Sequence, residues 1–250
     1  MIVIKSKREI EKMRAAGEIV AEVLRIISGS IKEGISTEEL DSLAEKETVK
    51  RKAIPAFKGY NGYPYTLCCS INDQVVHGMP SSRRLRSGDI VSIDFGVLYC
   101  GLYGDAAVTL PVGKISLSAQ RLIDVTHESL FRAIKCAEAG RRLSDVSHAV
   151  QCYAESNGFS VVRDFVGHGI GTSLHESPQI PNYGPPGKGV ILRPGMVLAI
   201  EPMINERGHG VKVLDDGWTA VTVDGGYSAH FEHTVLVSDG GPEILTQLRD

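Results

Sequence analysis

Residues 85–94 read LRSGDIVSID, and residues 192–201 read LRPGMVLAIE. Leucine, arginine, glycine and isoleucine recur at equivalent places, the apolar positions match, and each stretch ends in a carboxylate, Asp94 or Glu201. An apolar run after a glycine turn is typical of a strand. Similarity at one fixed offset, here 107 residues, indicates an internal duplication.

Two helical segments precede the first stretch. Residues 8–28 carry apolar side chains at helical spacing, which are Ile10, Met13, Val20, Val23, Leu24 and Ile27. We expect this helix to end near Gly34 in a left-handed conformation. Residues 36–39, Ser-Thr-Glu-Glu, form a capping box that begins a second helix. From residue 54 to 113, short alternating apolar runs with glycine turns predict a sheet.

The same order of elements returns in the second half. Residues 118–139 have a helical pattern that Gly140 ends, and Ser144 begins another helix that ends at residues 157–158, Asn-Gly. The offset of 107 residues places Thr37 on Ser144, at the start of the second helix of each half. Chance similarity over ten residues is the alternative, but the agreement of the helices favours duplication.

These patterns predict an α+β fold in one catalytic domain, residues 1–250, built from two pseudo-symmetric helix-helix-sheet halves of about 1–113 and 114–250. The helices should cover one face of a central antiparallel sheet and leave the opposite face free. Asp94 and Glu201 would then meet near the pseudo-axis, where we expect a metal site.

The composition is that of an ordinary globular protein, with 42% hydrophobic and 23% charged residues and a formal charge of −3. This charge argues against direct reading of nucleic acid, which normally needs a basic face. Only four apolar residues, 1–4, precede the first charge cluster, too few for a signal peptide or a membrane span. The five cysteines show no disulfide or zinc-ribbon spacing, so we expect a reducing, cytoplasmic location.

Asp94 and Asp105 lie in two strand-like runs, residues 91–95 and 105–110. A hairpin centred on Tyr99 and Cys100 would place the two aspartates directly opposite each other, with their Cβ atoms about 5 Å apart. Two like charges this close are destabilising unless a cation lies between them. For this pair alone, two solvent-facing aspartates in an irregular hairpin are an equal alternative.

His168 lies in a Gly-His-Gly-Ile-Gly run whose glycines clear space around the imidazole, and His175 follows seven residues later. Glu201 ends an almost wholly apolar strand, so it should be either neutral or bound to a cation. Glu232 precedes another strand-like run. Four carboxylates and one imidazole suit manganese, iron(II) or cobalt better than a structural zinc. Two ions about 3.5–4 Å apart balance the charge better than one.

One ordered set of side chains resembles the metal ligands of the pita-bread metallopeptidases: Asp94, Asp105, His168, Glu201 and Glu232. Within that group, the run FVGHGIG at residues 165–171, followed by His175 and by IPNY at 180–183, is similar to the signature of the type I methionine aminopeptidases. The resemblance covers nearly the whole chain and implies the pita-bread fold.

The resemblance implies that the protein removes the N-terminal methionine of nascent proteins and prefers a small second residue. Two divalent ions would activate a hydroxide that attacks the first peptide bond. Asp94 would bind one ion, Asp105 and Glu232 would bridge both ions, and His168 with Glu201 would hold the other. Glu201 would also relay the proton of the hydroxide.

The resemblance also implies roles for residues that contact the substrate. His175 would donate a hydrogen bond to the developing oxyanion, and His77 would contact the substrate. Six positions match those around the methionine side chain: Phe57, Tyr60, Tyr63, Cys68, Leu174 and Trp218. Without the resemblance, an aromatic core with a buried Cys68 is the simpler interpretation of these six.

Three positions depart from the family pattern. Leu174 stands where bacterial relatives usually have phenylalanine, and Phe57 where cysteine is frequent, so we expect both to reshape the pocket. Ala106 and Ala107 follow Asp105 where threonine or serine is commoner, which removes a hydroxyl able to orient a bridging carboxylate.

Other functions fit parts of the sequence. A pita-bread peptidase that cleaves before proline usually has an additional N-terminal domain, whereas the first helix here begins at about residue 8. A metal-free pita-bread protein that binds nucleic acid or ribosomes would have lost ligands, and all five are present. A type II methionine aminopeptidase has an insertion after the histidine region, but only 25 residues separate His175 from Glu201. We expect a monomer that acts on nascent N-termini and contacts no membrane; a contact with the ribosome is left open.

Overall fold

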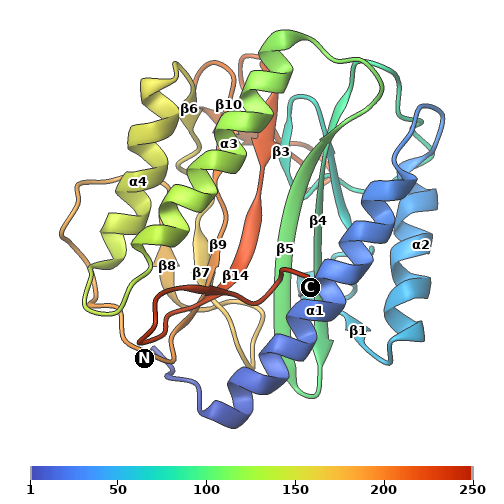
Figure 1. Cartoon of the computed structure of the whole chain (residues 1–250). Helices are drawn as coiled ribbons and strands as arrows, with labels where there is room; N and C mark the ends of the chain where they lie inside the picture. Colours follow the sequence, from blue (N-terminus) through green and yellow to red (C-terminus); the bar gives the residue numbers. More distant parts are fainter. Residues whose placement is uncertain (1, 249–250) are drawn as a thin grey trace.

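The computed structural model describes residues 2–248. Within this range, four α-helices come in two pairs, and each pair is followed by strands (Figure 1); a short 3-10 helix, η1, spans Tyr60–Gly62. The bounds of the helices are Lys7–Ser30 for α1, Thr37–Lys50 for α2, Leu117–Cys136 for α3 and Leu143–Ser156 for α4. The predicted order of elements, helix-helix-sheet repeated twice, is therefore confirmed.

Among the described residues, nine strands form the main sheet, in which every pair is antiparallel. Its central path is β1-β4-β5-β14-β9-β7-β8, while β2 pairs with β4 and β15 with β14. The bounds are β1 Ile54–Pro55, β2 Cys68–Ile71, β4 Ile90–Tyr99, β5 Leu102–Pro111, β7 Gly167–Gly169, β8 Glu176–Ile180, β9 Val197–Ile200, β14 Glu232–Leu236 and β15 Glu243–Ile244.

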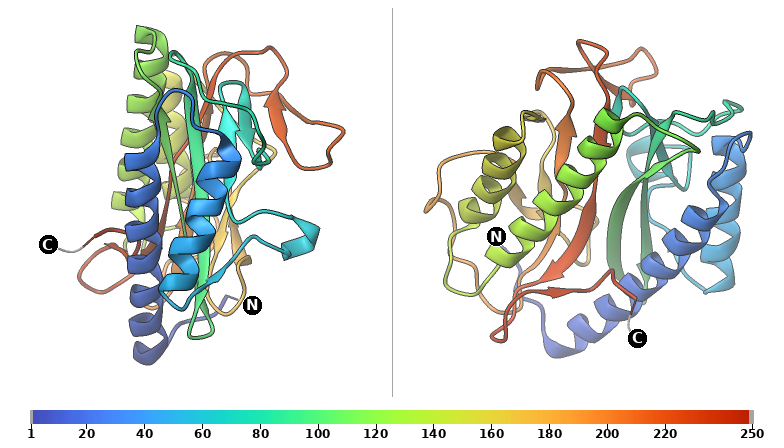
Figure 2. Two further views of the ribbon diagram at one scale, coloured as in Figure 1. Left: turned by 90° about the vertical axis from the view of Figure 1, so that its right-hand side faces the viewer. Right: turned by 45° about the horizontal axis from the view of Figure 1, so that its top comes forward.

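Two smaller sheets of three strands each flank the main one, in the orders β13-β10-β6 and β11-β12-β3. Their bounds are β3 Gln74–Val76, β6 Ser160–Val161, β10 Met203–Asn205, β11 Val211–Val213, β12 Ala220–Thr222 and β13 Ser228–His230. The helices α1 and α3 lie against one face of the main sheet, and the segments around β3 and β11–β12 project from the other (Figure 2). No helix among residues 2–248 is long and apolar enough to cross a membrane.

The repeated stretches become β4 and β9, and the strands that pair with them, β5 and β14, lie side by side at the centre of the sheet. The same hydrogen bonds introduce both stretches. Gly34 N–H donates to Leu85 O at 2.8 Å, and Gly140 N–H donates to Leu192 O at 2.9 Å. Each half also has its own cluster of buried apolar side chains between its helices and its strands.

Two details of the helix predictions are wrong. Gly34 and Gly140 do have positive φ angles, of 88° and 90°, but α1 and α3 end four residues earlier, so these glycines form the turn between helices. The fourth helix begins at Leu143, one residue before the predicted Ser144, so the second helices are 106 residues apart. The strands keep the offset of 107, and the repeat therefore contains a one-residue insertion between helix and strand.

The helix α1 approaches β5 and the C-terminal segment closely because it has a glycine at the contact. A Cβ on Gly17 would collide with the carbonyl group of Leu245, and Gly104 of β5 leaves similar space beside Gly17. Gly29, near the end of the same helix, has open space around its Cα.

We predict that Gly17→Ala destabilises the protein although alanine is the better helix former by about 1 kcal/mol. The added methyl group would push α1 away from Leu245. Gly29→Ala, the matched control, should gain up to about 1 kcal/mol because nothing opposes the propensity. Urea unfolding of both variants measures the difference. A Gly17→Ala protein as stable as Gly29→Ala would contradict the packing described here.

Candidate metal centre and substrate pocket

The register of the main sheet brings three predicted acids into one row on one face. Asp94 of β4 is paired with Ala107 of β5, and Ala107 is paired with Glu232 of β14. Ile200 of β9 is paired with His233 of β14. Glu201, the next residue after Ile200, therefore lies opposite Glu232. Paired residues project to the same side of a sheet, so these side chains share a face.

The hairpin of β4 and β5 differs from the prediction by two residues. Asp94 is paired with Ala107 and Asp105 with Gly96, so the two aspartates are diagonal neighbours and do not face each other. The turn is Cys100-Gly101, whose φ angles of 51° and 81° are the positive pair that a tight two-residue hairpin turn requires. The two side chains still share a face, because a shift of two residues preserves the alternation.

Asp105 and His168 occupy the next row of the same face. His168 of β7 is paired with Ala199 of β9, which is paired with Thr234 of β14. Thr234 Oγ1 accepts a hydrogen bond from Asp105 N–H at 3.0 Å and donates one to Asp105 O at 2.8 Å. A threonine side chain thus holds the backbone of Asp105 at the junction of the two halves.

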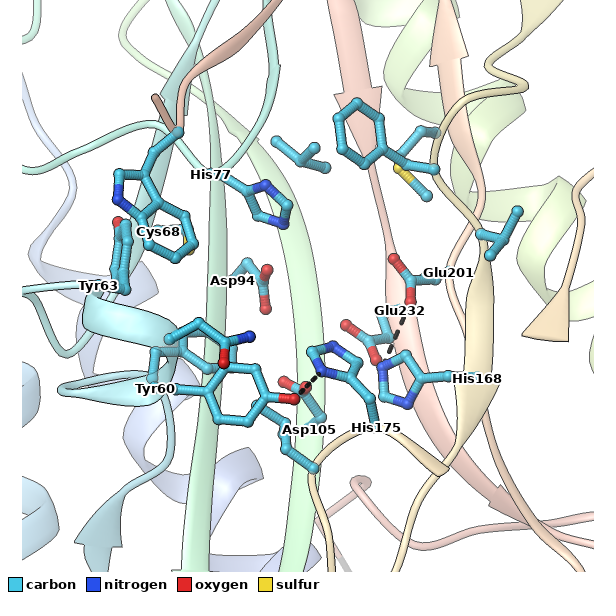
Figure 3. Close-up of a pocket in the computed structure, with 18 of the residues that line it drawn as sticks. Tyr60, Tyr63, Cys68, His77, Asp94, Asp105, His168, His175, Glu201 and Glu232 are labelled. Atoms are coloured by element: carbon cyan, nitrogen blue, oxygen red, sulfur yellow. Dashed lines mark hydrogen bonds and ion pairs between the residues drawn. The ribbon is translucent and has the colours of Figure 1, made fainter. Parts of the chain in front are cut away.

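Three carboxylate oxygens in these rows are buried without a hydrogen-bond partner among the described residues, one each on Asp94, Asp105 and Glu232. Asp105, His168 and Glu232 each offer a ligand atom within 4.8 Å of the other two. The nearest oxygen of Glu201 lies 3.5 Å from His168 Nε2. Figure 3 shows these side chains converging between the strands. Unpartnered buried oxygens beside an imidazole are the donor set of a cation site.

Burial raises the pKa of all four carboxyl groups. It raises the pKa of Asp94 to about 7. The pKa values of Asp105, Glu201 and Glu232 lie well above the ordinary range, because burial is reinforced by the neighbouring acids. Asp105 and Glu232 are only 3% and 2% exposed, whereas Asp94 and Glu201 keep some surface toward the cavity. Without a cation, burial therefore favours the protonated forms of these acids.

His168 is held with one nitrogen free. Its Nδ1 lies 2.9 Å from Gly169 O, and donation there leaves the lone pair of Nε2 facing the carboxylates. Burial lowers its pKa to about 4, so the imidazole is neutral at pH 7. The flanking glycines are required sterically, because a Cβ on Gly167 would meet Ala199 O and one on Gly169 would collide with Ser177 O.

His175 and His77 line the same cavity as the acids. Tyr60 Oη is 2.7 Å from His175 Nδ1, and the His175 ring lies 4.3 Å, centroid to centroid, from the ring of His168. Burial lowers the pKa of His175, and it lowers that of His77 to about 4. His77 has a positive φ of 59°, an unusual conformation for a non-glycine residue and one that clusters at functional sites.

All predicted site residues line one cavity of about 320 Å³. Its apolar part contains the six predicted pocket residues Phe57, Tyr60, Tyr63, Cys68, Leu174 and Trp218. The rings of Tyr63 and Trp218 meet edge to face with their centroids 5.0 Å apart. The hydroxyl group of Tyr63 lies within hydrogen-bond distance of Leu67 O and Gly78 O, and this fixes the Tyr63 ring in the pocket wall. Cys68 is paired with Asp94 across β2 and β4, so the apolar pocket directly adjoins the acids.

The sequence patterns missed several residues at this site. His230 is 1% exposed, its Nε2 has no hydrogen-bond partner among the described residues, and that atom lies 3.7 Å from Glu201 Oε2. Its proximity to Glu232 in the sequence was the available signal. The cavity is also lined by residues that no pattern singled out: Asn61, Val76, Asp164 and Met203.

One family model and many relatives match this chain. The model of metallopeptidase family M24 matches residues 11–239. Methionine aminopeptidase 1 of Bacillus subtilis is 54% identical over 248 residues, which are 99% of this chain and 100% of that relative. The crystal structure of methionine aminopeptidase from Thermotoga maritima is 53% identical, has a TM-score of 0.98, and covers 99% of this chain and 100% of its own.

Prolidases share this fold. The prolidase from Pyrococcus horikoshii has a TM-score of 0.80 at 24% identity, and this chain covers 65% of it, so that likeness concerns the fold alone. The match to these methionine aminopeptidases extends over the full length of the chain, and about half of the aligned residues are identical. The chain therefore belongs to metallopeptidase family M24 and, within it, to the methionine aminopeptidases.

Proposed function

We propose that this protein removes the N-terminal methionine of nascent polypeptides by metal-dependent hydrolysis of the first peptide bond, with a preference for a small second residue. One observation carries the proposal: buried acids with unpartnered oxygens adjoin an apolar, aromatic-lined pocket within the same cavity. The acids suit a cation, and the pocket suits an unbranched apolar side chain.

The donor set fits two divalent ions. Asp94 would hold one, Asp105 and Glu232 would bridge both, and His168 with Glu201 would hold the other. Four acids around a single ion would leave excess negative charge, which supports the pair. Cobalt, manganese and iron(II) all accept such ligands. When bound, such ions polarise the peptide carbonyl and make water a nucleophile at neutral pH.

Side chains of the protein would transfer the proton and stabilise the oxyanion. Glu201 would take a proton from the attacking water and deliver it to the leaving amine, since its carboxyl group lies 3.5 Å from His168 Nε2 and within electrostatic reach of Asp94 and Asp105. If Tyr60 donates to Nδ1 of the neutral His175, the imidazole proton is on Nε2 and can donate to the oxyanion. His77, whose ring lies beside Phe165 and Trp218 in the cavity wall, would contact the substrate.

The substrate side chain would lie among the six pocket residues, with the second residue in the crowded space beside His168 and His175. We further propose that the whole chain acts as one catalytic domain, as a monomer in the cytoplasm. The five cysteines are all free, which supports a reducing compartment. Access to nascent chains would place the protein near the ribosome.

We predict that the melting temperature of the metal-free protein falls as the pH rises from about 7 to 8, through the raised pKa of Asp94. In this window the unfolded carboxyl groups have lost their protons and the unfolded histidines, with a pKa of about 6.5, have lost most of theirs, whereas burial keeps the acids of the folded state partly protonated, Asp94 with its pKa of about 7 among them. The folded state therefore binds more protons, and this contribution to stability is lost as pH rises. With Mn²⁺ bound, the fall should disappear, and scanning calorimetry measures both forms. A flat or rising profile for the metal-free protein would contradict the protonated cluster.

We predict that Asp105→Asn or Glu232→Gln abolishes binding of two ions and nearly all activity, because a neutral amide is a poor bridging ligand. Affinity for Mn²⁺ should fall by at least about 100-fold. Asp124→Asn is the matched control, since Asp124 is exposed on α3 and accepts a hydrogen bond from Gln120. Titration calorimetry reads the stoichiometry. Two ions per chain with full activity in Asp105→Asn would rule out its bridging role.

We predict that peptides beginning Met-Gly, Met-Ala and Met-Ser are cleaved, whereas those beginning Met-Lys and Met-Leu are not. Rejection of norleucine at the first position should be weak, because pocket size alone discriminates by only about 1–3 kcal/mol. Leu174 in place of a larger aromatic should loosen the pocket further. Catalytic efficiency across a panel varied at both positions checks this. Preferential cleavage of N-terminal leucine, or indifference to the second residue, would refute it.

A further inference from the structure

Lys5 and Glu176 form a buried ion pair outside the cavity. Lys5 Nζ lies 2.5 Å from Glu176 Oε2, and the two side chains are only 3% and 11% exposed. Glu176 is the residue after His175, and neither Lys5 nor Glu176 lines the cavity. Removing two charges from water is unfavourable, so a buried ion pair is weak evidence for a role in stability alone.

The other oxygen of Glu176 organises the turn that carries His175. Its Oε1 accepts hydrogen bonds from Thr172 N–H at 2.7 Å and from Ser173 N–H at 3.2 Å, and it lies 3.3 Å from Thr172 Oγ1. Burial would raise the pKa of Glu176, but Lys5 and these donors lower it overall, which keeps the carboxylate charged. One carboxylate thus joins Lys5 to the whole turn that ends at His175.

The turn also has a glycine whose missing side chain leaves room for the ion pair. A Cβ on Gly171 would collide with the end of the Lys5 side chain and with Glu176 Oε1. The backbone of Gly171 is fixed on both sides, since its carbonyl accepts from Tyr103 N–H at 2.9 Å and its N–H donates to Ser173 O at 3.1 Å. The third glycine of the Gly-His-Gly-Ile-Gly run therefore makes room for the ion pair and not for His168.

Lys5 is itself anchored to the second half. Its N–H donates to Gly195 O at 2.8 Å, in the turn that leads into β9. The N-terminal segment before α1 therefore crosses to the second half and places one ammonium group beneath the His175 turn. His175 is thus fixed from both sides, by Tyr60 at its ring and by the ion pair at its backbone.

We propose that Lys5 and Glu176 are positioning residues for His175, holding its imidazole at the place where it donates to the oxyanion. This rests on the proposed role of His175. A displacement of about 1 Å at such a donor costs up to about 10²-fold in rate. Loss of the ion pair should therefore lower turnover while leaving the ion and the methionine pocket in place.

The test compares Glu176→Gln, in the wild-type and His175→Ala backgrounds, using protein loaded with Mn²⁺. Glu176→Gln alone should lower kcat by about 10- to 100-fold with KM and Mn²⁺ affinity nearly unchanged. In His175→Ala, which itself loses about 10²–10³-fold, Glu176→Gln should cause no further loss. Glu128→Gln is the matched control, because Glu128 pairs with Arg132 on the exposed surface of α3.

A second variant and a second readout keep the outcomes distinct. Lys5→Met removes the ion pair but keeps the hydrogen bonds that Glu176 accepts in the turn. This variant is used in the same comparison if the Glu176→Gln protein does not fold. The imidazole ¹⁵N signals of His175 report its hydrogen bond to Tyr60 directly, and they should shift or broaden in either variant. Unchanged kcat, or the same loss in both backgrounds, would overturn the proposal. If His175→Ala keeps full turnover, the oxyanion role fails, and the His175 signals alone decide whether the ion pair positions the ring.

Discussion

Mutual repulsion among four buried acids is the constraint on which this structure depends. Asp94, Asp105, Glu201 and Glu232 lie on one face of a sheet, and burial raises the pKa of all four. Neighbouring acids raise the pKa of the last three further, and three oxygens of the group find no hydrogen-bond partner among residues 2–248. An arrangement so unfavourable in the bare protein persists only when the surrounding structure fixes it. Here two apolar cores, one mainly in each half, hold the strands in register around the acids, and Val108 packs against both.

The duplication explains how the acids come together. Asp94 ends the repeated stretch of the first half and Glu201 that of the second, while Asp105 and Glu232 lie on the two central strands. Each half contributes one acid from the end of its repeated stretch and one from its central strand, so the site exists only at the junction of the halves. The two halves differ at the site: His168 and the turn to His175 occur in the second half only, whereas Phe57, Tyr60 and Tyr63 of the aromatic pocket come from the first half and meet Trp218 from the second.

Local and repeated features were predictable from the sequence. The capping box at Ser36 and Glu39 is present, because both of its partners lie within one turn of the helix. The fold follows from the repeat, and the side chains that meet in the cavity follow from the family resemblance. The hairpin centre was wrong because it depends on where φ is positive, and Cys100 is an unusual residue to adopt that conformation beside Gly101. His230 and the Lys5–Glu176 pair were missed because their contacts join residues far apart in the chain, which no local pattern encodes.

The central claim is that the acids act through bound ions on an N-terminal methionine. Release of methionine from a Met-Ala-Ser peptide by the metal-free protein, titrated separately with Mn²⁺, Fe²⁺ and Co²⁺, tests it most directly. The account predicts no release without metal and a rise in activity that saturates at two ions per chain. Full release by protein kept free of metal with a chelator would contradict it.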